Sequence, residues 1–168
     1  GRTIVGGGGN VAIDVARNAC RLGSEHVEMF CLESEVQMPA SEEERREAVE
    51  DGAHISCGWG PKEIHLDEAG RVCGIPFKRC TRVFDDEGRF APEYDENDLR
   101  RVDADRVVMS IGQSIVWGDL LAGSKVELGR GQGALADPQT YQTAEPDIFV
   151  GGDVYTGPSF AIDAIAAG

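Results

Sequence analysis

The stretch Thr3-Ile-Val-Gly-Gly-Gly-Gly-Asn-Val-Ala12 decides the fold. Its first three residues have the pattern of a short buried strand, and the glycines break that strand into a turn. From Val11 to Leu22 apolar residues recur at helical spacing, and Gly23 stands where a helix-ending glycine belongs. Val27 to Leu32 has the pattern of a second buried strand. These residues predict a β-α-β unit with a right-handed crossover, the basic unit of an α/β fold.

The glycines follow the spacing Gly7-x-Gly9-x-x-Ala12, directly after a strand and at the start of a helix. In this pattern the first glycine permits a tight turn, the second lets a pyrophosphate approach the backbone, and the small third residue lets helix and strand pack. The helix N-terminus supplies free N–H groups to the phosphates. We therefore predict a Rossmann-like site for a nicotinamide dinucleotide, made by Gly7, Gly8, Gly9, Asn10, Val11 and Ala12. A glycine turn without a ligand is the alternative.

The end of the second strand is expected to select the dinucleotide, because the adenosine ribose lies there. Glu33 follows this strand, and a carboxylate can accept hydrogen bonds from both ribose hydroxyls while it repels a 2′-phosphate. No Arg or Lys occurs between Cys31 and Ser41 to bind such a phosphate. NAD(H) is therefore favoured over NADP(H), and a solvated loop glutamate is the alternative reading of Glu33.

The following segments predict one more helix and a small antiparallel β-meander. Ser41 and Glu44 form a capping-box pair before a charged helix over Glu42 to Glu50. The meander is expected from Ala53 to Ile111, and its last strand, Asp105 to Ile111, is expected to rejoin the main sheet. Turns are expected at Asp67 to Gly70, at Asp85 to Gly88 and at Asp95 to Asp98. The predicted fold class is α/β, a Rossmann-like three-layer domain with a small antiparallel β-meander.

A second strand–turn–helix unit is expected near the end of the chain. The strand is predicted over Asp147 to Val150, the turn at Gly151-Gly152-Asp153, and the helix over Phe160 to Ala167. The carboxyl end of a strand beside a helix N-terminus is a place where open α/β sheets bind ligands, and an Asp there can hold polyol hydroxyls. Asp153 as a helix cap or turn residue is at least as well supported by the sequence alone.

Composition limits the partners. Sixteen Lys and Arg against thirty Asp and Glu give 16 − 30 = −14, which disfavours nucleic acid and anionic membranes. The apolar runs are too short for a membrane span. The five cysteines are odd in number and contain no C-x-x-C pair, which predicts reduced thiols in the cytoplasm and neither metal nor disulfide chemistry in this segment. The three histidines stand apart, without metal-ligand spacing.

Taken together, several motifs closely resemble one family, the small (beta) subunit of glutamate synthase and related FAD-dependent pyridine nucleotide-disulfide-type oxidoreductases. The motifs occur in the family's order: residues 7–17, Met38-Pro-Ala40 before the acidic helix, Ile111-Gly112-Gln113, Phe149 to Asp153, and Ala161 to Gly168. The resemblance implies a nicotinamide domain over residues 1–112, inserted in an FAD-binding domain whose C-terminal portion is residues 113–168. It also implies that Gly112, Gly152 and Asp153 contact cofactors, Asp153 at the FAD ribitol.

One departure bears on the function. Where relatives of glutamate synthase have two arginines that bind the NADP phosphate, this chain has Leu32 and Glu33. The expected function is therefore hydride transfer between NADH and FAD in the full-length protein, with electrons passed to an iron–sulfur or redox partner subunit. No catalytic residue is expected, because hydride transfer needs positioning rather than an acid or base. The alternatives are an NADPH-linked glutamate synthase small subunit and a non-catalytic NAD-binding sensor module.

Overall fold

The computed structural model describes residues 1–167, and it divides the chain into two compact units, Gly1–Gly112 and Gln113–Gly168. Each unit is described by itself. Gly168, the last residue of the motif that begins at Ala161, lies outside the described residues.

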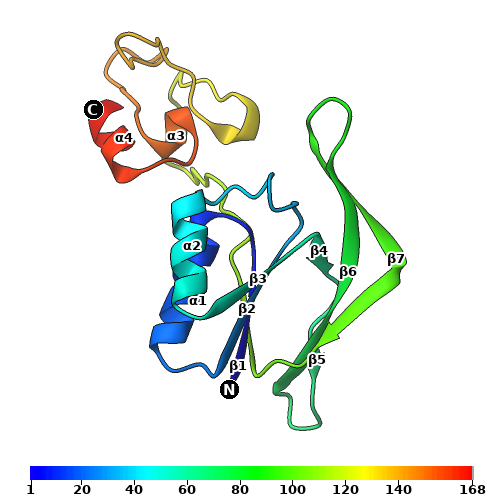
Figure 1. The fold of residues 1–168 in the computed structure, drawn as a ribbon. Helices are drawn as coiled ribbons and strands as arrows, with labels where there is room; N and C mark the ends of the chain where they lie inside the picture. Colours follow the sequence, from blue (N-terminus) through cyan, green and yellow to red (C-terminus); the bar gives the residue numbers. More distant parts are fainter. Residues whose placement is uncertain (168) are drawn as a thin grey trace. The chain divides into compact units, whose positions relative to one another are not determined.

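The first unit is built on a parallel sheet of four strands in the order β3-β2-β1-β8. Two helices, α1 and α2, cover one face of this sheet, and an antiparallel sheet covers the other (Figure 1). The helix layer and the parallel sheet consist of β1 (Arg2–Gly6), α1 (Asn10–Arg21), β2 (His26–Cys31), α2 (Glu42–Glu50), β3 (Ala53–Cys57) and β8 (Arg106–Met109). The predicted three-layer α/β fold is confirmed.

The predicted β-α-β unit is present from β1 to β2. Helix α1 ends because Gly23 adopts a left-handed φ of +86°, which lets its N–H bond to the Cys20 carbonyl and the Ser24 N–H to the Ala19 carbonyl. This pair of hydrogen bonds is the Schellman motif. Glycine adopts the left-handed conformation that the motif requires without a Cβ clash. The chain then returns parallel to β1, with Arg2 opposite His26.

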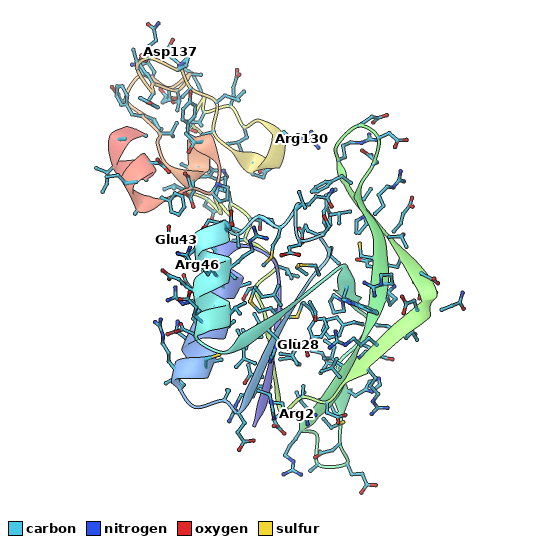
Figure 2. The ribbon with its side chains drawn as sticks, viewed as in Figure 1. Arg2, Glu28, Glu43, Arg46, Arg130 and Asp137 are labelled. Carbon is cyan, nitrogen blue, oxygen red and sulfur yellow. The ribbon has the colours of Figure 1, made fainter. Side chains whose placement is uncertain are left out.

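Strand β2 divides its side chains between the two outer layers. Val27, Met29 and Cys31 are buried with the helices, whereas Phe30 is buried with the antiparallel sheet. Successive side chains of a strand point to opposite faces, so a strand covered on both sides reads as a nearly continuous apolar run. Glu28 interrupts that run on the antiparallel side, where it accepts hydrogen bonds from Ser56 and Arg100; Figure 2 shows Glu28 between the two sheets.

The antiparallel layer consists of β4 (Trp59–Pro61), β5 (His65–Leu66), β6 (Val72–Phe84) and β7 (Phe90–Val102). The meander was predicted to begin at Ala53, and this is wrong: β3 pairs parallel with β2 and belongs to the main sheet. The pattern of five residues cannot show whether they form an edge strand of the parallel sheet or of the antiparallel sheet. The strand near 105–111 does rejoin the main sheet, as β8 beside β1.

The two expected Asp-to-Gly turns share one structure. In each, the glycine N–H bonds to the carbonyl of the aspartate, as in Gly70 to Asp67 and Gly88 to Asp85, and both glycines have positive φ. The run Asp95 to Asp98 is instead a bulge inside β7, because Lys78 pairs with Leu99 while the next residue, Arg79, pairs with Asp95. A bulge leaves residues of one strand without partners and bends that strand locally, which suits the turn-like sequence.

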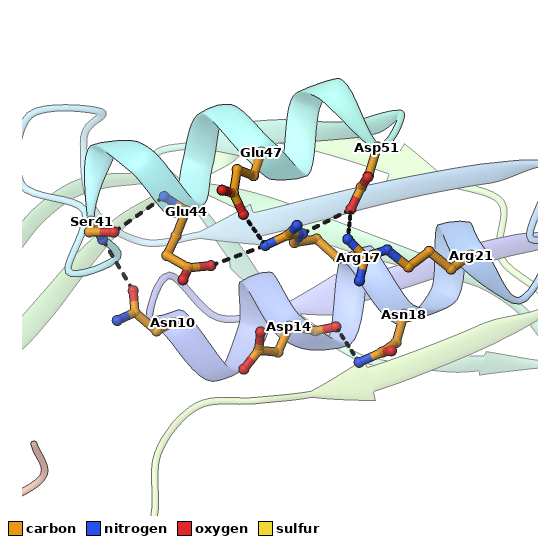
Figure 3. Close-up of polar contacts among 9 residues, drawn as sticks. All are labelled: Asn10, Asp14, Arg17, Asn18, Arg21, Ser41, Glu44, Glu47 and Asp51. Atoms are coloured by element: carbon orange, nitrogen blue, oxygen red, sulfur yellow. Dashed lines mark hydrogen bonds and ion pairs between the residues drawn. The ribbon is translucent and has the colours of Figure 1, made fainter. Parts of the chain in front are cut away.

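Helices α1 and α2 are joined by a cluster of charged side chains (Figure 3). The Arg17 guanidinium lies 2.5 Å from Glu47, 2.8 Å from Asp51 and 3.5 Å from Glu44. Ser41 caps α2 as predicted, with its hydroxyl accepting from the Glu44 N–H at 3.2 Å. The reciprocal half of the capping box is absent, since Asn10 accepts the Ser41 N–H and the Glu44 carboxylate faces Arg17.

Replacing Arg17 by methionine is expected to lower stability most at neutral pH. The hydrogen bond from Arg17 lowers the pKa of Asp51 below its ordinary 3.8, so this carboxylate stabilises the fold above pH 3.8 and stops doing so as the pH falls through its folded-state pKa. The melting temperatures of wild type and variant should therefore differ by a constant amount from pH 7 down to about pH 3.8 and converge below it. Arg46→Met, which removes only an exposed ion pair with Glu50, is the control. A gap that stays constant below pH 3.8 as well would contradict the assigned role of Arg17.

The second unit has little regular structure. It contains a 3₁₀ turn, η1 (Arg130–Gln132), and two helices, α3 (Asp153–Thr156) and α4 (Ala161–Ala167). The helix predicted over Phe160 to Ala167 is confirmed as α4. The strand predicted over Asp147 to Val150 is wrong: Phe149 is 61% exposed, and its antiparallel pairing with Gln142 is limited to one isolated bridge.

Candidate functional site

The glycine loop between β1 and α1 is held in place by its first glycine. Gly7 has a φ of +139°, and a Cβ added to it would lie 2.3 Å from the backbone oxygen of Ser110. Its N–H donates to the Phe30 carbonyl at 2.9 Å. The fold itself therefore requires glycine at position 7, because any side chain would collide with the chain leaving β8.

Gly8 packs against the end of the neighbouring strand. A Cβ at this position would lie 2.9 Å from the Cβ of Cys31 and 3.0 Å from a carboxylate oxygen of Glu33. The Gly8 carbonyl accepts the Ala40 N–H at 2.9 Å, so the segment after β2 returns to the loop. The second glycine thus fixes the loop beside Glu33.

Gly9 differs from Gly7 and Gly8, because no atom of the described residues requires a glycine at this position. Its φ of −92° and ψ of 174° suit any residue, and a Cβ there would have nothing within 4 Å. It is the N-cap of α1 and supplies no side-chain hydrogen bond. Within residues 1–167 the N–H groups of Asn10 and Val11 also have no hydrogen-bond partner. Open space and free donors at a helix N-terminus suit an anion that approaches the backbone closely.

The remaining residues of the predicted loop have structural roles. Ala12 is fully buried under the loop, 3.2 Å from where a Cβ on Gly7 would lie, so a larger side chain would not fit. The Asn10 side-chain oxygen is taken by the Ser41 N–H, while Val11 is 68% exposed. Asn10 and Val11 can therefore contact a ligand chiefly through their backbone N–H groups.

Glu33 lies at the same edge of the sheet as the glycine loop. The turn that carries it is fixed by its own carbonyl, which accepts the Gly58 N–H at 2.9 Å and contacts the Cys31 thiol at 3.6 Å. The side chain is half-buried, with one carboxylate oxygen close to Gly8. The structure thus brings together Gly8, Gly9 and Glu33, the combination from which the sequence predicted a ribose and a pyrophosphate subsite.

A surface cleft of about 450 Å³ lies next to Glu33, and two arginines of β6 line it together with Leu32, Ser34 and Cys57. The Arg79 guanidinium stacks 3.8 Å over the Trp59 ring and lies 3.1 Å from Asp98. Arg82 pairs with Glu93 and Asp86. These cations lie on β6, outside the segment from Cys31 to Ser41 in which the sequence shows no Arg or Lys. No local signal links β6 to the end of β2.

The other predicted cofactor residues are Gly112, at the end of the first unit, and Gly152 and Asp153, in the second unit. Gly112 ends the first unit with a φ of +108°, and nothing lies within 4 Å of a Cβ added there. In the second unit Gly152 has a φ of +62° and packs against Ala164, so the fold requires it. Asp153 begins α3; its side chain is exposed and caps no helix. The cap or turn role open for Asp153 in the sequence is therefore not what the structure shows, whereas Asp67, Asp85 and Asp137 do hold turns.

Other kinds of site find little support in the residues described. Residues 1–167 contain no group of three or more His, Cys, Asp and Glu side chains placed to hold a metal ion. His65 lies 3.2 Å from Glu63, and this contact involves no other titratable group. None of the helices in the described range has the length and apolar character to cross a membrane.

The fold and the glycine loop define the first unit as a Rossmann-type domain of the FAD/NAD(P)-binding oxidoreductase class. Among solved structures, T. acidophilum thioredoxin reductase matches with a TM-score of 0.76 and 18% identity, over 97% of this chain and 47% of that one. At this identity the match shows the fold alone. The family model described as pyridine nucleotide-disulphide oxidoreductase matches residues 1–168. The chain belongs to this family.

Two curated relatives are similar over nearly the whole chain. The glutamate synthase [NADPH] small chain of Escherichia coli K12 is 33% identical over 99% of this chain and 36% of its own length. The NADP(+)-dependent formate dehydrogenase subunit beta of Moorella thermoacetica is 33% identical over 96% of this chain and 23% of its own length. The chain thus spans about a third or less of the relatives it matches. The predicted resemblance to the glutamate synthase small subunit and its relatives is confirmed.

Proposed function

We propose that residues 1–112 bind a nicotinamide dinucleotide at the glycine loop, with the pyrophosphate over Gly9 and the adenosine ribose at Glu33. Gly9 carries this proposal. The fold gives a reason for glycine at positions 7 and 8 but none at position 9, and a pyrophosphate close to the backbone provides one. The free N–H groups of Asn10 and Val11 then bind its oxygens, with the α1 dipole favouring negative charge.

In the complete protein the bound NADH would give its hydride to FAD, the cofactor that carries the redox chemistry in this family. The contribution of this chain is to bind and orient the nicotinamide nucleotide, and no acid or base is needed. Asp153 suits a contact to a polyol hydroxyl of FAD, because its carboxylate is exposed and makes no hydrogen bond within residues 1–167. The family resemblance and the match of the pyridine nucleotide-disulphide oxidoreductase model over residues 1–168 support the assignment of residues 113–168 to the FAD-binding portion.

The electrons would pass from FAD to an iron–sulfur or redox partner subunit. Two matched relatives are named as a small chain and a beta subunit, which supports a role as one subunit of a larger assembly. All five cysteines are free, in keeping with a cytoplasmic setting. The charge of −14 supports small-molecule and protein partners rather than nucleic acid or an anionic membrane.

NADH is favoured over NADPH because Glu33 stands at the ribose position, where its carboxylate repels a 2′-phosphate. A second candidate, an NADPH-linked subunit, is supported by the names of both relatives and by Arg79 and Arg82 in the neighbouring cleft. Each of these arginines is already paired with a carboxylate, so a phosphate would have to displace Asp98 or Glu93. That competition favours the NADH assignment.

Replacing Glu33 by arginine is expected to reverse the preference. Calorimetric titration of wild type at one fixed salt concentration should give tighter binding of NADH than of NADPH. In Glu33→Arg, the order should invert, by about tenfold or more, because a charge-assisted contact to phosphate is worth about 1.5–3 kcal/mol.

Glu43→Arg makes the same change of charge on an exposed position of α2 and should leave the preference unchanged. Tighter binding of NADPH by wild type would establish the second candidate and overturn the role of Glu33. Absence of binding by either nucleotide at millimolar concentration would contradict the proposed site.

A further inference from the structure

Two cysteines that are far apart in the sequence end adjacent strands of the parallel sheet. Cys31 is the last residue of β2 and Cys57 the last of β3, and the two are directly opposite in the register. Their sulfur atoms are 3.6 Å apart. Both thiols are free, and no C-x-x-C spacing in the sequence indicates the pair, because only the fold brings the two residues together.

The geometry of this pair suits a covalent bond. Neighbouring strands are separated by about 4.8 Å, and a disulfide requires a Cα separation of about 4.4–6.8 Å. The two sulfurs would need to approach by roughly 1.6 Å to reach the bonded distance of about 2.0 Å. That movement is within the reach of a χ1 adjustment at each cysteine.

The two thiols differ in access. Cys57 is partly buried and lines the cleft beside Glu33, whereas Cys31 is only 3% exposed. Burial raises the pKa of the Cys31 thiol, so its thiolate is scarce. Of the pair, Cys57 is therefore the thiol that a reagent in the cleft meets first, and Cys31 is placed to react with the product.

We propose that Cys31 and Cys57 form a modification site, a dithiol that closes to an intramolecular disulfide by exchange with low-molecular-weight disulfides such as oxidised glutathione. The Cys57 thiolate attacks one sulfur of the reagent, which forms a mixed disulfide and releases one thiol. The Cys31 thiolate then attacks the Cys57 sulfur and releases the second thiol. The protein loses two electrons and two protons, and the reagent gains both as two thiols.

The location gives the site a consequence for the glycine loop. A Cβ on Gly8 would lie 2.9 Å from the Cβ of Cys31, and the Cys31 thiol contacts the carbonyl of Glu33. A disulfide would draw the Cys31 sulfur toward β3 and remove its contact with the Glu33 carbonyl, next to Gly8 of the glycine loop. This part of the inference concerns the protein's own atoms and is independent of the proposed dinucleotide.

The most direct test is cysteine mapping after exposure of the reduced native chain to oxidised glutathione. Trypsin cuts after Arg21, Arg45, Arg46, Lys62, Arg71, Lys78, Arg79 and Arg82, so each of the five cysteines falls in a different peptide. The expected product has lost the mass of two hydrogen atoms, contains linked Cys31 and Cys57 peptides, and returns to the reduced mass with dithiothreitol.

Three variants sharpen the test. Cys31→Ser should keep glutathione on Cys57, and Cys57→Ser should leave Cys31 unmodified. Cys73→Ser, a partly buried cysteine of β6 outside the pair, should still form the link.

Three results for wild type would overturn the proposal. These are glutathione retained on Cys57, no reaction at either thiol of the pair, and a link from Cys57 to Cys80. Cys80 is the nearest rival because its N–H bonds to the Gly58 carbonyl at 2.8 Å. Because each result is obtained on wild type, none depends on whether a variant folds.

Discussion

Replacing Gly9 by alanine is expected to weaken binding of NADH by about 5- to 150-fold while the fold remains intact. The added methyl group meets no atom within residues 1–167, so the cost to stability is limited to about 1 kcal/mol for an N-cap glycine. The same methyl group would occupy the space that the pyrophosphate needs, and crowding of this kind costs about 1–3 kcal/mol. Calorimetry and thermal melting of the same sample measure both quantities.

The matched control is Gly133→Ala in the second unit, where φ is also ordinary and the new Cβ would have only a van der Waals contact at 3.5 Å. It should change neither binding nor stability by more than about 1 kcal/mol. Equal NADH affinities of wild type and Gly9→Ala would contradict the placement of the pyrophosphate over Gly9. A variant that unfolds would show instead that Gly9 has a structural role.

Phe77→Ala is expected to cost the first unit about 3–5 kcal/mol of its free energy of unfolding. Phe77 of β6 is fully buried and stacks on Phe30 of β2, with ring centroids 3.8 Å apart. This contact joins the antiparallel layer to the face of the parallel sheet opposite the helices. Alanine would leave a cavity between the two layers that neither sheet can close without distortion.

Denaturant unfolding followed by tryptophan fluorescence measures this loss, since Trp59 belongs to the same cluster. The control is Phe90→Ala, because Phe90 is 64% exposed and makes one edge contact with Phe84. It should cost about 1 kcal/mol or less. Similar losses for the two variants would show that the antiparallel layer does not pack on the sheet as described.

The N-terminal part of the fold could be predicted because its signals are local. The strand before Gly6, the helix ended by Gly23 and the cap at Ser41 each depend on residues within one turn or one strand. The assignment of Ala53 to Cys57 failed because parallel pairing with β2 is a long-range property that a five-residue pattern does not contain. The strand at Asp147 to Val150 failed for a related reason, since its pairing with Gln142 stops after one bridge, and a local apolar pattern does not show how far a pairing extends.

The candidate site could be predicted in part. Gly7, Gly9 and Glu33 follow from a motif whose spacing has a direct physical cause, and the fold places Glu33 beside the loop. Arg79 and Cys57 lie near Glu33 because the fold brings β3 and β6 to the same cleft, although the two strands belong to different sheets. No spacing in the sequence indicates this. The capping box predicted that the Glu44 carboxylate accepts the Ser41 N–H, but Asn10 accepts it and Glu44 pairs with Arg17. This difference likewise depends on how α1 and α2 pack.

The central claim is that a nicotinamide dinucleotide binds at the glycine loop, and amide chemical shifts of the isotopically labelled chain test it most directly. On titration with NADH the largest shifts should occur at Gly8, Gly9, Asn10, Val11 and Glu33, with smaller shifts at the same amides for NADPH. Shifts confined to the cleft residues Arg79 to Phe84, or no saturable shift at the loop with either nucleotide, would contradict the claim.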